Sequence, residues 1–343
     1  MLVALTAALA AQATTVVVQC AADNTLYSNA QGVLSNGAGS GLFVGLNGLG
    51  LTLRTAMRFN VAAAVPAGAS IVSARLTVRS NKSNYVPLLE VTAHRVLQAW
   101  GEGTSVAPSG GGYGAQAQPN DATWLHTFYP NTFWTTPGGD FVAQPSTTLW
   151  LPAVGTVSSP HGPGMVADAQ LWLDQPSQNF GWLLKADDAA ATVNAHRLSS
   201  RTATSNRPTL TITYLLPGQT STWGTGCPTA NGTFTFGYVG TMTGGSTIQF
   251  TYQNGPPSTF AANFFSLGLD HPGTVLQPNC SVYLPSTLEL IPGQVFPLDA
   301  AGAASFTWPV PLIPGGYFVT QSAALDSSPV GLALTNAGVA KIL

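Results

Sequence analysis

Apolar and polar residues alternate in short runs along the whole chain, which is the pattern of half-buried β-strands. The clearest run, residues 71–79 (IVSARLTVR), places every second residue from Val72 to Val78 on an apolar face. Gly, Pro, Asn and Ser cluster between the runs and predict turns. Many short strands joined by such turns are typical of a β-sandwich or barrel. Comparable runs occur at residues 14–19, 89–93 and 209–214.

One stretch, residues 163–173 (PGMVADAQLWL), has a helical pattern instead. Met165, Ala169 and Trp172 recur at near-helical spacing, and Pro176 follows closely enough to end a helix. We therefore expect an all-β protein with a single helix.

The distribution of charge divides the chain near residues 216–218. All eight arginines precede this point, whereas the last 127 residues contain one lysine and four carboxylates. The later segment carries about seven strand-like runs, a number that suits an immunoglobulin-like β-sandwich. We expect two domains, residues 14–216 and a smaller one at residues 217–343.

The N-terminal residues 2–13 (LVALTAALAAQA) form an apolar run that ends in Ala11-Gln12-Ala13, the pattern of a signal-peptide cleavage site. The run is too short to span a bilayer, and no later stretch resembles a transmembrane helix. We expect residues 1–13 to be a signal peptide, and the protein to be secreted or held at the cell surface without membrane insertion. The alternative for this run is a buried first strand.

The chain carries few charges, with 11 Lys and Arg and 13 Asp and Glu, a net charge of −2. This composition argues against nucleic-acid binding, which needs a basic face, and against a polybasic membrane-surface protein. Because the chain carries so few charges, little electrostatic repulsion opposes self-association, and the mean hydropathy is positive at +0.21. The uncharged segment 331–340 is an expected strand edge that another copy could extend.

Three cysteines remain to be assigned: Cys20, Cys227 and Cys280. An exported protein can form disulfides. Because Cys227 and Cys280 both lie in the second domain, we expect them to pair. Cys20 is then either a buried free thiol or the partner of an intermolecular bridge.

Several separated motifs of the first domain, taken in their order and spacing, resemble the DNRLRE-domain family. The resemblance covers residues 14–216 and implies a jelly-roll β-sandwich of the kind grouped with carbohydrate-binding modules, on a secreted or surface protein. The motifs are Ala22–Leu26, Leu42–Gly45, Arg54–Phe59, Pro66–Leu76, Trp100–Gly103, Ala122–Trp124, Trp134 with Gly138–Asp140, Asn179–Trp182 and Arg207–Tyr214.

The second domain is similar to a β-rich domain found at the C-termini of large secreted bacterial proteins. This resemblance implies no known activity. The matching segments are Gly226–Pro228, Leu267–Leu269, Cys280–Tyr283, Pro309–Pro311, Gln321 and Asn336–Ala337.

Catalytic motifs are not evident in the sequence. It contains no G-x-S-x-G motif, and no two of its three glutamates lie close together. Glu102 with Asp121 or Asp140 could provide the carboxylate pair of a glycosidase. Asp140 follows two glycines, however, and suits a turn residue that binds its own backbone. We expect a protein that is not an enzyme.

Calcium is the cofactor that the residues favour, because it takes carboxylates and loop carbonyls that need no compact motif. Asp23 and Asn24 near the first strand, with Asp187 and Asp188 near the other end of the domain, would share one edge of a sandwich if the first and last strands pair. We expect a structural calcium at these four residues, with solvated Asx turns as the alternative. The five histidines are far apart and do not indicate zinc.

Aromatic residues are the main candidates for ligand binding, since the apolar faces of sugar rings stack on them. Trp124, His126, Tyr129 and Trp134 cluster in a polar loop, residues 122–134 (ATWLHTFYPNTFW), and loop aromatics are good ligand candidates. The alternative is that they cap the end of the sandwich. Trp172 and Trp182, by contrast, are expected in the core.

Four arginines, Arg54, Arg58, Arg75 and Arg79, would form a basic stripe if their strands pair. Such a stripe, with Arg75 and Arg79 as ligand residues, would suit an acidic polysaccharide. Cross-strand pairing with carboxylates is the alternative.

Two functional hypotheses follow. In the first, the protein is a non-catalytic carbohydrate-binding or adhesive protein whose partner is a polysaccharide or a cell-surface glycan. In the second, it is a structural subunit of an extracellular fibre or surface layer, with another copy as its partner.

Overall fold

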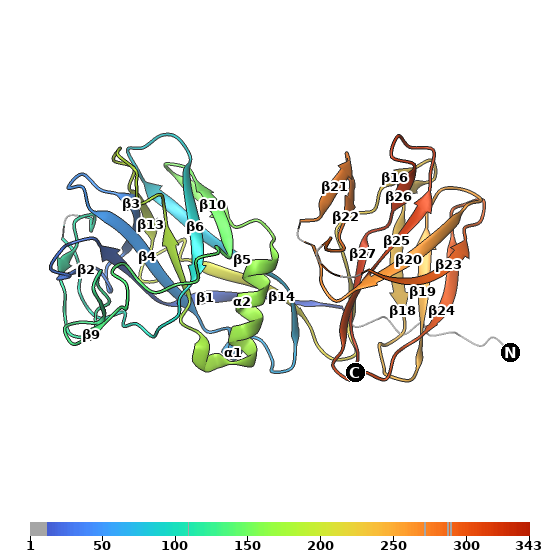
Figure 1. The fold of residues 1–343 in the computed structure, drawn as a ribbon, viewed down its shortest axis with the longest axis horizontal. Coiled ribbons are helices and arrows are strands. Elements are labelled where there is room, and N and C mark those ends of the chain that lie inside the picture. The colour runs from blue at the N-terminus through green and yellow to red at the C-terminus, as the bar shows by residue number, and fades with distance from the viewer. Residues whose placement is uncertain (1–11, 109, 271, 287, 289) are drawn as a thin grey trace. The chain divides into compact units, whose positions relative to one another are not determined.

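The computed structural model describes residues 12–343 except residues 109, 271, 287 and 289. The predicted signal peptide lies almost entirely outside the described residues. The described chain is nearly all β, which confirms that part of the predicted fold class, and it divides into two compact units (Figure 1). The N-terminal unit comprises Val16–Ala67 and Ser73–Ile212; the C-terminal unit comprises Gly68–Val72, Thr213–Leu343 and the described residues before Val16.

The N-terminal unit is built on ten paired strands. Their order is β1-β14-β5-β13-β3-β4-β12-β6-β10, with β11 paired to β5 and β1 paired also to β4. Their bounds are β1 Thr14–Tyr27, β3 Gly41–Leu46, β4 Thr52–Phe59, β5 Ser70–Lys82, β6 Leu89–Arg95, β10 Thr147–Leu151, β11 Gly155–Ser158, β12 Trp182–Lys185, β13 His196–Ser199 and β14 Thr209–Leu215.

The alternation seen in the sequence governs these strands. In β5, the residues from Val72 to Val78 at every second position are buried, and in β6 the buried positions include Leu89, Val91 and Ala93. Smaller pairs join loops of the unit. These are β2 (Leu34–Ser35) with β7 (Ala115–Gln116), and β8 (His126–Phe128) with β9 (Thr132–Phe133).

Helix α2 (Pro163–Asp174) confirms the predicted helix. Pro163 stands at its first turn, where a missing N–H costs nothing. Its buried Trp172 lies with its ring centroid 4.4 Å from that of Trp182, so both tryptophans are core residues as predicted. Two short helices outside the prediction are α1 (Val61–Ala64) and the 3-10 turn η1 (Pro176–Gln178).

The C-terminal unit contains two larger sheets. One has the order β15-β27-β25-β20-β23 with β26 paired to β25, and the other has the order β18-β19-β24. Two small pairs, β16–β17 and β21–β22, complete the unit. The bounds are β15 Thr220–Trp223, β16 Pro228–Thr229, β17 Gly232–Thr233, β18 Thr235–Val239, β19 Thr247–Gln253, β20 Phe260–Ser266, β21 Thr274–Gln277, β22 Cys280–Val282, β23 Ile291–Pro297, β24 Ala304–Pro309, β25 Tyr317–Leu325, β26 Leu332–Leu334 and β27 Ala337–Lys341.

Aromatic side chains fill the core of the C-terminal unit. Phe250 of β19 is fully buried, with ring centroids 5.2 Å from Phe236 of β18 and 5.7 Å from Trp308 of β24. Phe265 of β20, in the larger sheet, lies 4.8 Å from Trp308. These contacts join the two larger sheets through one apolar core.

Strand β27 corrects the expected strand edge at residues 331–340. All five of its residues are buried, and it pairs with β15 on one side and β25 on the other. An interior strand cannot accept a strand from another copy, so the expectation is wrong for residues 337–340; β26, in the same segment, pairs with β25. In the strand order of this sheet, the two ends are β15 and β23.

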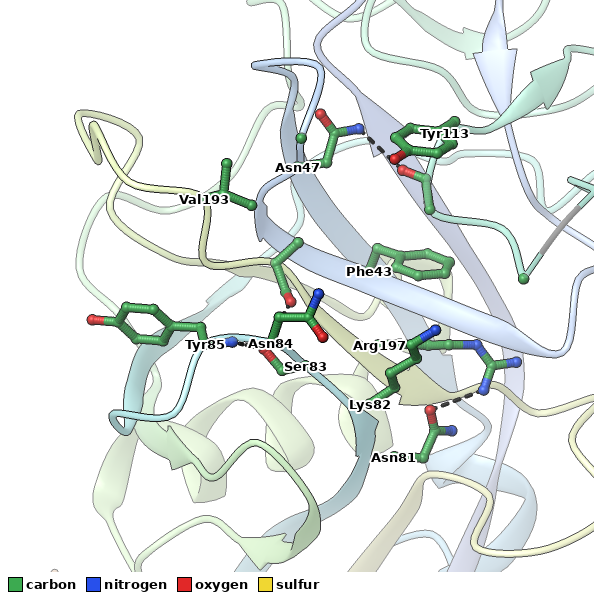
Figure 2. A pocket seen from close by; sticks show the side chains of 14 residues that line it. Phe43, Asn47, Asn81, Lys82, Ser83, Asn84, Tyr85, Tyr113, Val193 and Arg197 are labelled. Carbon is green, nitrogen blue, oxygen red and sulfur yellow. Dashed lines mark hydrogen bonds between the residues drawn. The ribbon is translucent and has the colours of Figure 1, made fainter.

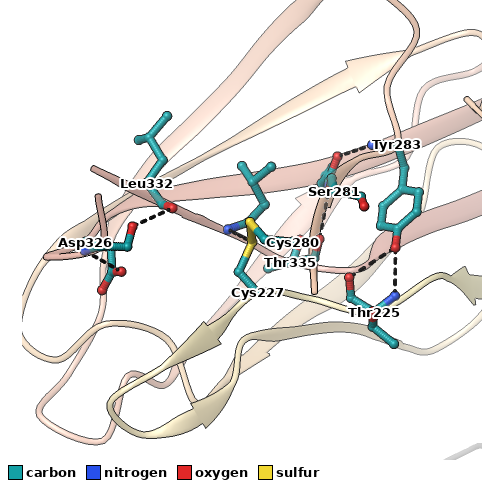
Figure 3. The surroundings of a disulfide bond; sticks show 11 residues. Thr225, Cys227, Cys280, Ser281, Tyr283, Asp326, Leu332 and Thr335 are labelled. Carbon is teal, nitrogen blue, oxygen red and sulfur yellow. Dashed lines mark hydrogen bonds between the residues drawn. A yellow bond between two sulfur atoms is a disulfide. The ribbon is translucent and has the colours of Figure 1, made fainter. Parts of the chain in front are cut away.

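The cysteine assignment agrees with the structure. Cys227 and Cys280 form a disulfide with a Cα–Cα distance of 4.3 Å, which confirms the predicted pair (Figure 3). The Sγ atom of Cys227 also accepts a hydrogen bond of 3.0 Å from the N–H of Leu334. Cys20 is a buried free thiol. No helix in the described ranges is long and apolar enough to cross a membrane.

Candidate functional site

A groove of about 680 Å³ opens on the N-terminal unit beside strands β3, β5 and β13 (Figure 2). Its volume lies within the usual range for ligand sites, roughly 300–1,000 Å³. Its lining is aromatic, amide-rich and basic. It consists of Phe43, Asn47, Gly48, Asn81, Lys82, Ser83, Asn84, Tyr85, Gly110, Gly112, Tyr113, Val193, Ala195 and Arg197.

Three adjacent strands place one row of side chains across this groove. Arg197 of β13 is the register partner of Phe43 of β3 on one side and of Lys82 of β5 on the other. Phe43 and Arg197, as directly opposed residues, project to the same face of the sheet. The register of β13 and β5 shifts at this point, and both Asn81 and Lys82 line the groove beside Arg197. The pairing therefore brings Phe43, Arg197 and Lys82, which are far apart in the sequence, side by side.

The guanidinium of Arg197 is held in place by neutral groups. Its Nη1 donates to the Oδ1 of Asn81 at 2.9 Å and its Nη2 to the Oγ of Ser40 at 3.1 Å, while its Nε is buried without a hydrogen-bond partner among the described residues. A Cβ at Gly41 would lie 2.4 Å from that Nε, so glycine provides the space for the side chain.

The charge of the groove is positive. Neither Arg197 nor Lys82 belongs to an ion pair in the described part of the chain, and the described lining contains no Asp or Glu. Two cations without carboxylate partners favour an anionic ligand, and the planar donor fork of Arg matches a carboxylate or sulfate oxygen pair.

Aromatic rings and amides line the rest of the groove. The side chain of Tyr113 is 58% exposed, and Tyr85 is half-buried. Asn47 donates to the backbone oxygen of Gly112 at 3.0 Å, which fixes the loop that carries Tyr113. Ser83 donates to the backbone oxygen of Ala195 at 3.0 Å. The groove thus combines flat apolar surface with hydrogen-bonding groups on a fixed frame.

The aromatic loop predicted as a ligand site lies elsewhere, packed on the strands. Trp134 is buried beside Trp100, Leu26 and Leu183, and its Nε1 donates to the backbone oxygen of Thr123 at 2.9 Å. His126 is also buried, and burial lowers its pKa.

The other two predicted residues of this loop, Trp124 and Tyr129, are partly exposed. The guanidinium carbon of Arg54 lies 4.7 Å from the ring centroid of Trp124. Tyr129 meets the ring of His126 edge-on, with centroids 5.1 Å apart. The four residues therefore lie in one loop, with two of them covered, and their role as ligand residues stays a prediction.

The predicted arginine stripe is not continuous. Arg75 and Arg79 project from β5, where Arg75 Nε donates to Ser159 O at 2.9 Å and Arg79 Nη1 to Thr156 Oγ1 at 3.2 Å. Arg54 and Arg58 belong to β4, which pairs with β1, β3 and β12. Because β4 and β5 are not neighbours, the expectation of a four-arginine stripe on paired strands is wrong.

The predicted calcium ligands divide into two groups. At the first, Asp188 Oδ2 lies 2.7 Å from both Arg54 Nη2 and Lys185 Nζ. Burial opposes ionisation, but hydrogen bonds from Lys185 and Arg54 keep the pKa of Asp188 below its usual value. Asp187 accepts a hydrogen bond from the N–H of Ala189 at 2.9 Å. The carboxylate of Asp188 is thus already paired with two cations, and that of Asp187 already accepts a backbone hydrogen bond.

Asp23 and Asn24 form the second group. Asp23 Oδ2 accepts from the N–H of Arg201, and Asn24 Oδ1 from the N–H of Asn36 at 3.1 Å. Within the described residues, no three His, Cys, Asp or Glu side chains gather as a metal site would require. The four predicted residues thus have partners within the protein, and their role as calcium ligands stays a prediction.

The carboxylates weighed for catalysis also have structural partners. Glu102 forms an ion pair with Arg201 through both carboxylate oxygens. Asp140 accepts hydrogen bonds from the N–H groups of Thr135 and Thr136 at 2.7 and 2.9 Å, the turn role predicted for it. Asp121 accepts from the N–H of Gln118 at 2.7 Å.

Comparison with known proteins adds no assignment. No family model matches this chain, and no curated protein sequence matches it. The resemblance to the DNRLRE-domain family stays a prediction.

Proposed function

We propose that the protein is a secreted, non-catalytic carbohydrate-binding protein and that the groove between β3, β13 and β5 holds an acidic polysaccharide. The observation that carries this proposal is the pairing of Arg197 with Lys82, two cations without carboxylate partners among the described residues, in a groove that the exposed Tyr113 also lines. The exposed Tyr113 and the half-buried Tyr85 supply apolar surface for sugar rings, whereas Phe43 is buried beneath the groove. The asparagines supply hydrogen bonds for hydroxyl groups.

The strand order supports a jelly roll as the frame of this site. The neighbours β1-β14-β5-β11 and β4-β12-β6-β10 form two four-strand series, as two interleaved Greek keys would. For the C-terminal unit, two sheets joined by one aromatic core support an immunoglobulin-like sandwich.

The experiment is a binding titration of residues 14–343 with polygalacturonate, alginate, dextran sulfate and neutral mannan. We expect saturable binding to at least one acidic polymer, weaker binding at high salt because exposed charges are screened, and none to mannan. Lys82→Ala and Arg197→Ala should each weaken binding about tenfold, or about 1.4 kcal/mol. No binding to any acidic polymer would refute the proposal.

The matched control is Arg79→Ala, since Arg79 lies on the same strand as Lys82 but outside the groove lining. We expect this variant to bind like the wild type. If Arg79→Ala lost binding while Arg197→Ala kept it, the ligand would bind outside the groove, at Arg75 and Arg79 of β5, as the sequence analysis predicted.

A structural subunit is the second candidate, and a specific surface favours it. Phe260, Val295 and Leu325 are 63%, 66% and 64% exposed. They belong to the adjacent strands β20, β23 and β25, and their register places them on the face opposite the buried Ala261 and Ala324. Three exposed apolar side chains on one sheet face would suit contact with a second copy.

Sedimentation over a range of concentrations tests this second candidate. If the surface joins copies, the wild type should assemble as concentration rises, and Phe260→Ser with Leu325→Ser should remain monomeric. Leu267→Ser, which removes an equally exposed leucine just beyond β20, is the control and should assemble normally. A monomeric wild type at every concentration would exclude the structural subunit.

A further inference from the structure

A second hollow of about 690 Å³ adjoins the groove on the N-terminal unit. Its lining includes Trp150 of β10, whose side chain is 51% exposed and whose register partner on β6 is Glu90. Lys185 also lines it but is paired with Asp188. This hollow therefore offers an aromatic face without the free positive charge of the groove.

One narrow wall separates the two hollows. Along the segment 192–195, Thr192 and Asn194 line the second hollow, whereas Val193 and Ala195 line the groove. Tyr85 is part of both linings. The wall is thus one chain segment thick, and a tyrosine ring reaches both of its sides.

Hydrogen bonds hold the wall in place. The Oδ1 of Asn194 accepts from the N–H of Leu46 at 2.7 Å, and its backbone oxygen lies 2.9 Å from the Nδ1 of His196. Val193 at the crest is 54% exposed. A fixed wall with an exposed crest lets a long ligand pass over it without rearrangement of the strands.

We infer that a single polysaccharide chain occupies both hollows and crosses between them at Tyr85. This inference rests on the proposed function of the groove. In the groove, Arg197 and Lys82 bind the acidic groups of the chain. In the second hollow, Trp150 stacks on a sugar ring further along, where the carboxylates Glu90 and Asp187 favour hydroxyl groups over acidic ones. The second hollow thus adds affinity only for chains long enough to reach it.

Calorimetric titration with oligosaccharides of hyaluronate, in which acidic and neutral sugars alternate, tests this inference over lengths from two to about ten sugars. The wild type should bind one oligomer per protein, with affinity that rises with length until both hollows are filled. Trp150→Ala should leave the shortest bound oligomer unaffected and weaken the longest about tenfold. Leu97→Ala removes another exposed apolar side chain of this unit, outside both linings, and should change neither.

The outcomes separate the inference from the proposed function. If Arg197→Ala weakens the short oligomers but Trp150→Ala changes none, the groove stands and the second hollow is refuted. Two oligomers per protein would also overturn the shared chain, because each hollow would then act alone. If no oligomer binds the wild type, the inference fails, and the titration with polygalacturonate, alginate and dextran sulfate decides the proposed function.

Discussion

The Oδ2 atom of Asp23 accepts a hydrogen bond of 2.6 Å from the backbone N–H of Arg201, 178 residues further along the chain. The side chain of Arg201 pairs at the same time with Glu102, whose Oε1 accepts from the N–H of Asp23 at 2.9 Å. The three residues tie the first long strand to two distant loops of the N-terminal unit. The Oδ1 of Asp23 is buried without a hydrogen-bond partner among the described residues.

Asp23 should make stability fall as pH rises. Burial raises the pKa of Asp23 from 3.8 to about 7, so the folded protein retains a proton that the unfolded chain has released. This contribution is fully present below pH 3.8 and is lost as pH approaches 7. Asp23→Asn carries no charge and lacks this pH dependence. Its free energy of unfolding, relative to that of the wild type, should therefore rise by up to roughly 4 kcal/mol between pH 4 and pH 8.

Urea denaturation at several pH values measures this effect. The exposed Asp187→Asn is the control and should follow the wild-type pH dependence. Parallel pH curves for Asp23→Asn and the wild type would show that Asp23 ionises normally in the folded protein.

Reduction of the Cys227–Cys280 disulfide should destabilise the C-terminal unit. The bond closes a loop across a sequence separation of 53 residues, for which chain entropy gives roughly 4 kcal/mol. The double variant Cys227→Ala, Cys280→Ala should therefore unfold at a lower temperature in calorimetry. Cys20→Ala, which removes the free thiol, should leave the response to a reductant unchanged; equal melting with and without reductant would contradict the prediction.

Asp168 should be the residue that fastens helix α2 to the sheet. Its Oδ2 accepts from Trp182 Nε1 at 2.8 Å, and its Oδ1 lies 2.9 Å from Arg95 Nε. Asp168→Ala leaves a buried N–H and a guanidinium without partners, which should cost about 3 kcal/mol in the free energy of unfolding. Chemical denaturation should show less than about 0.5 kcal/mol for Asp174→Ala, at the exposed end of the same helix.

Trp134 and Trp124 should differ sharply when each is replaced by alanine. Trp134 is buried, so Trp134→Ala opens a cavity and should cost about 3–5 kcal/mol. Trp124 is half-exposed, and Trp124→Ala should cost about 1 kcal/mol through loss of its contact with Arg54. Thermal denaturation measures both. Equal, small losses would return Trp134 to the list of candidate ligand residues.

The sequence predicted those elements that carry their own local signal. Strand β5 alternates because one of its faces is buried, and helix α2 repeats at helical spacing and ends before Pro176. For β27 the sequence predicted a strand but not its interior position, because a strand whose residues are all buried shows no alternation. Strand β23 contains Pro292 and Gly293, which conceal a strand from a search by composition.

The groove was beyond prediction for a different reason. Phe43, Lys82 and Arg197 come from segments separated by about 40 and 115 residues, and only the register of β3, β13 and β5 brings them together. A lone Arg in a strand and a Lys at a strand end carry no mark of a site. The aromatic residues of the loop 122–134 were predicted as a site because they are close in sequence. In this fold, however, most neighbouring strands come from distant parts of the chain.

The interior position of β27 has a consequence for how the chain acquires its structure. Its neighbour β15 is synthesised more than 100 residues earlier, and must wait for β27 before its backbone groups are paired. Contacts of such long sequence separation form slowly, and an unpaired strand is prone to aggregate in the interval. Until β27 emerges from the ribosome, β15 and β25 lack the strand that joins them. A polypeptide stopped at residue 336 would leave unpaired the edges of β15 and β25 that β27 covers.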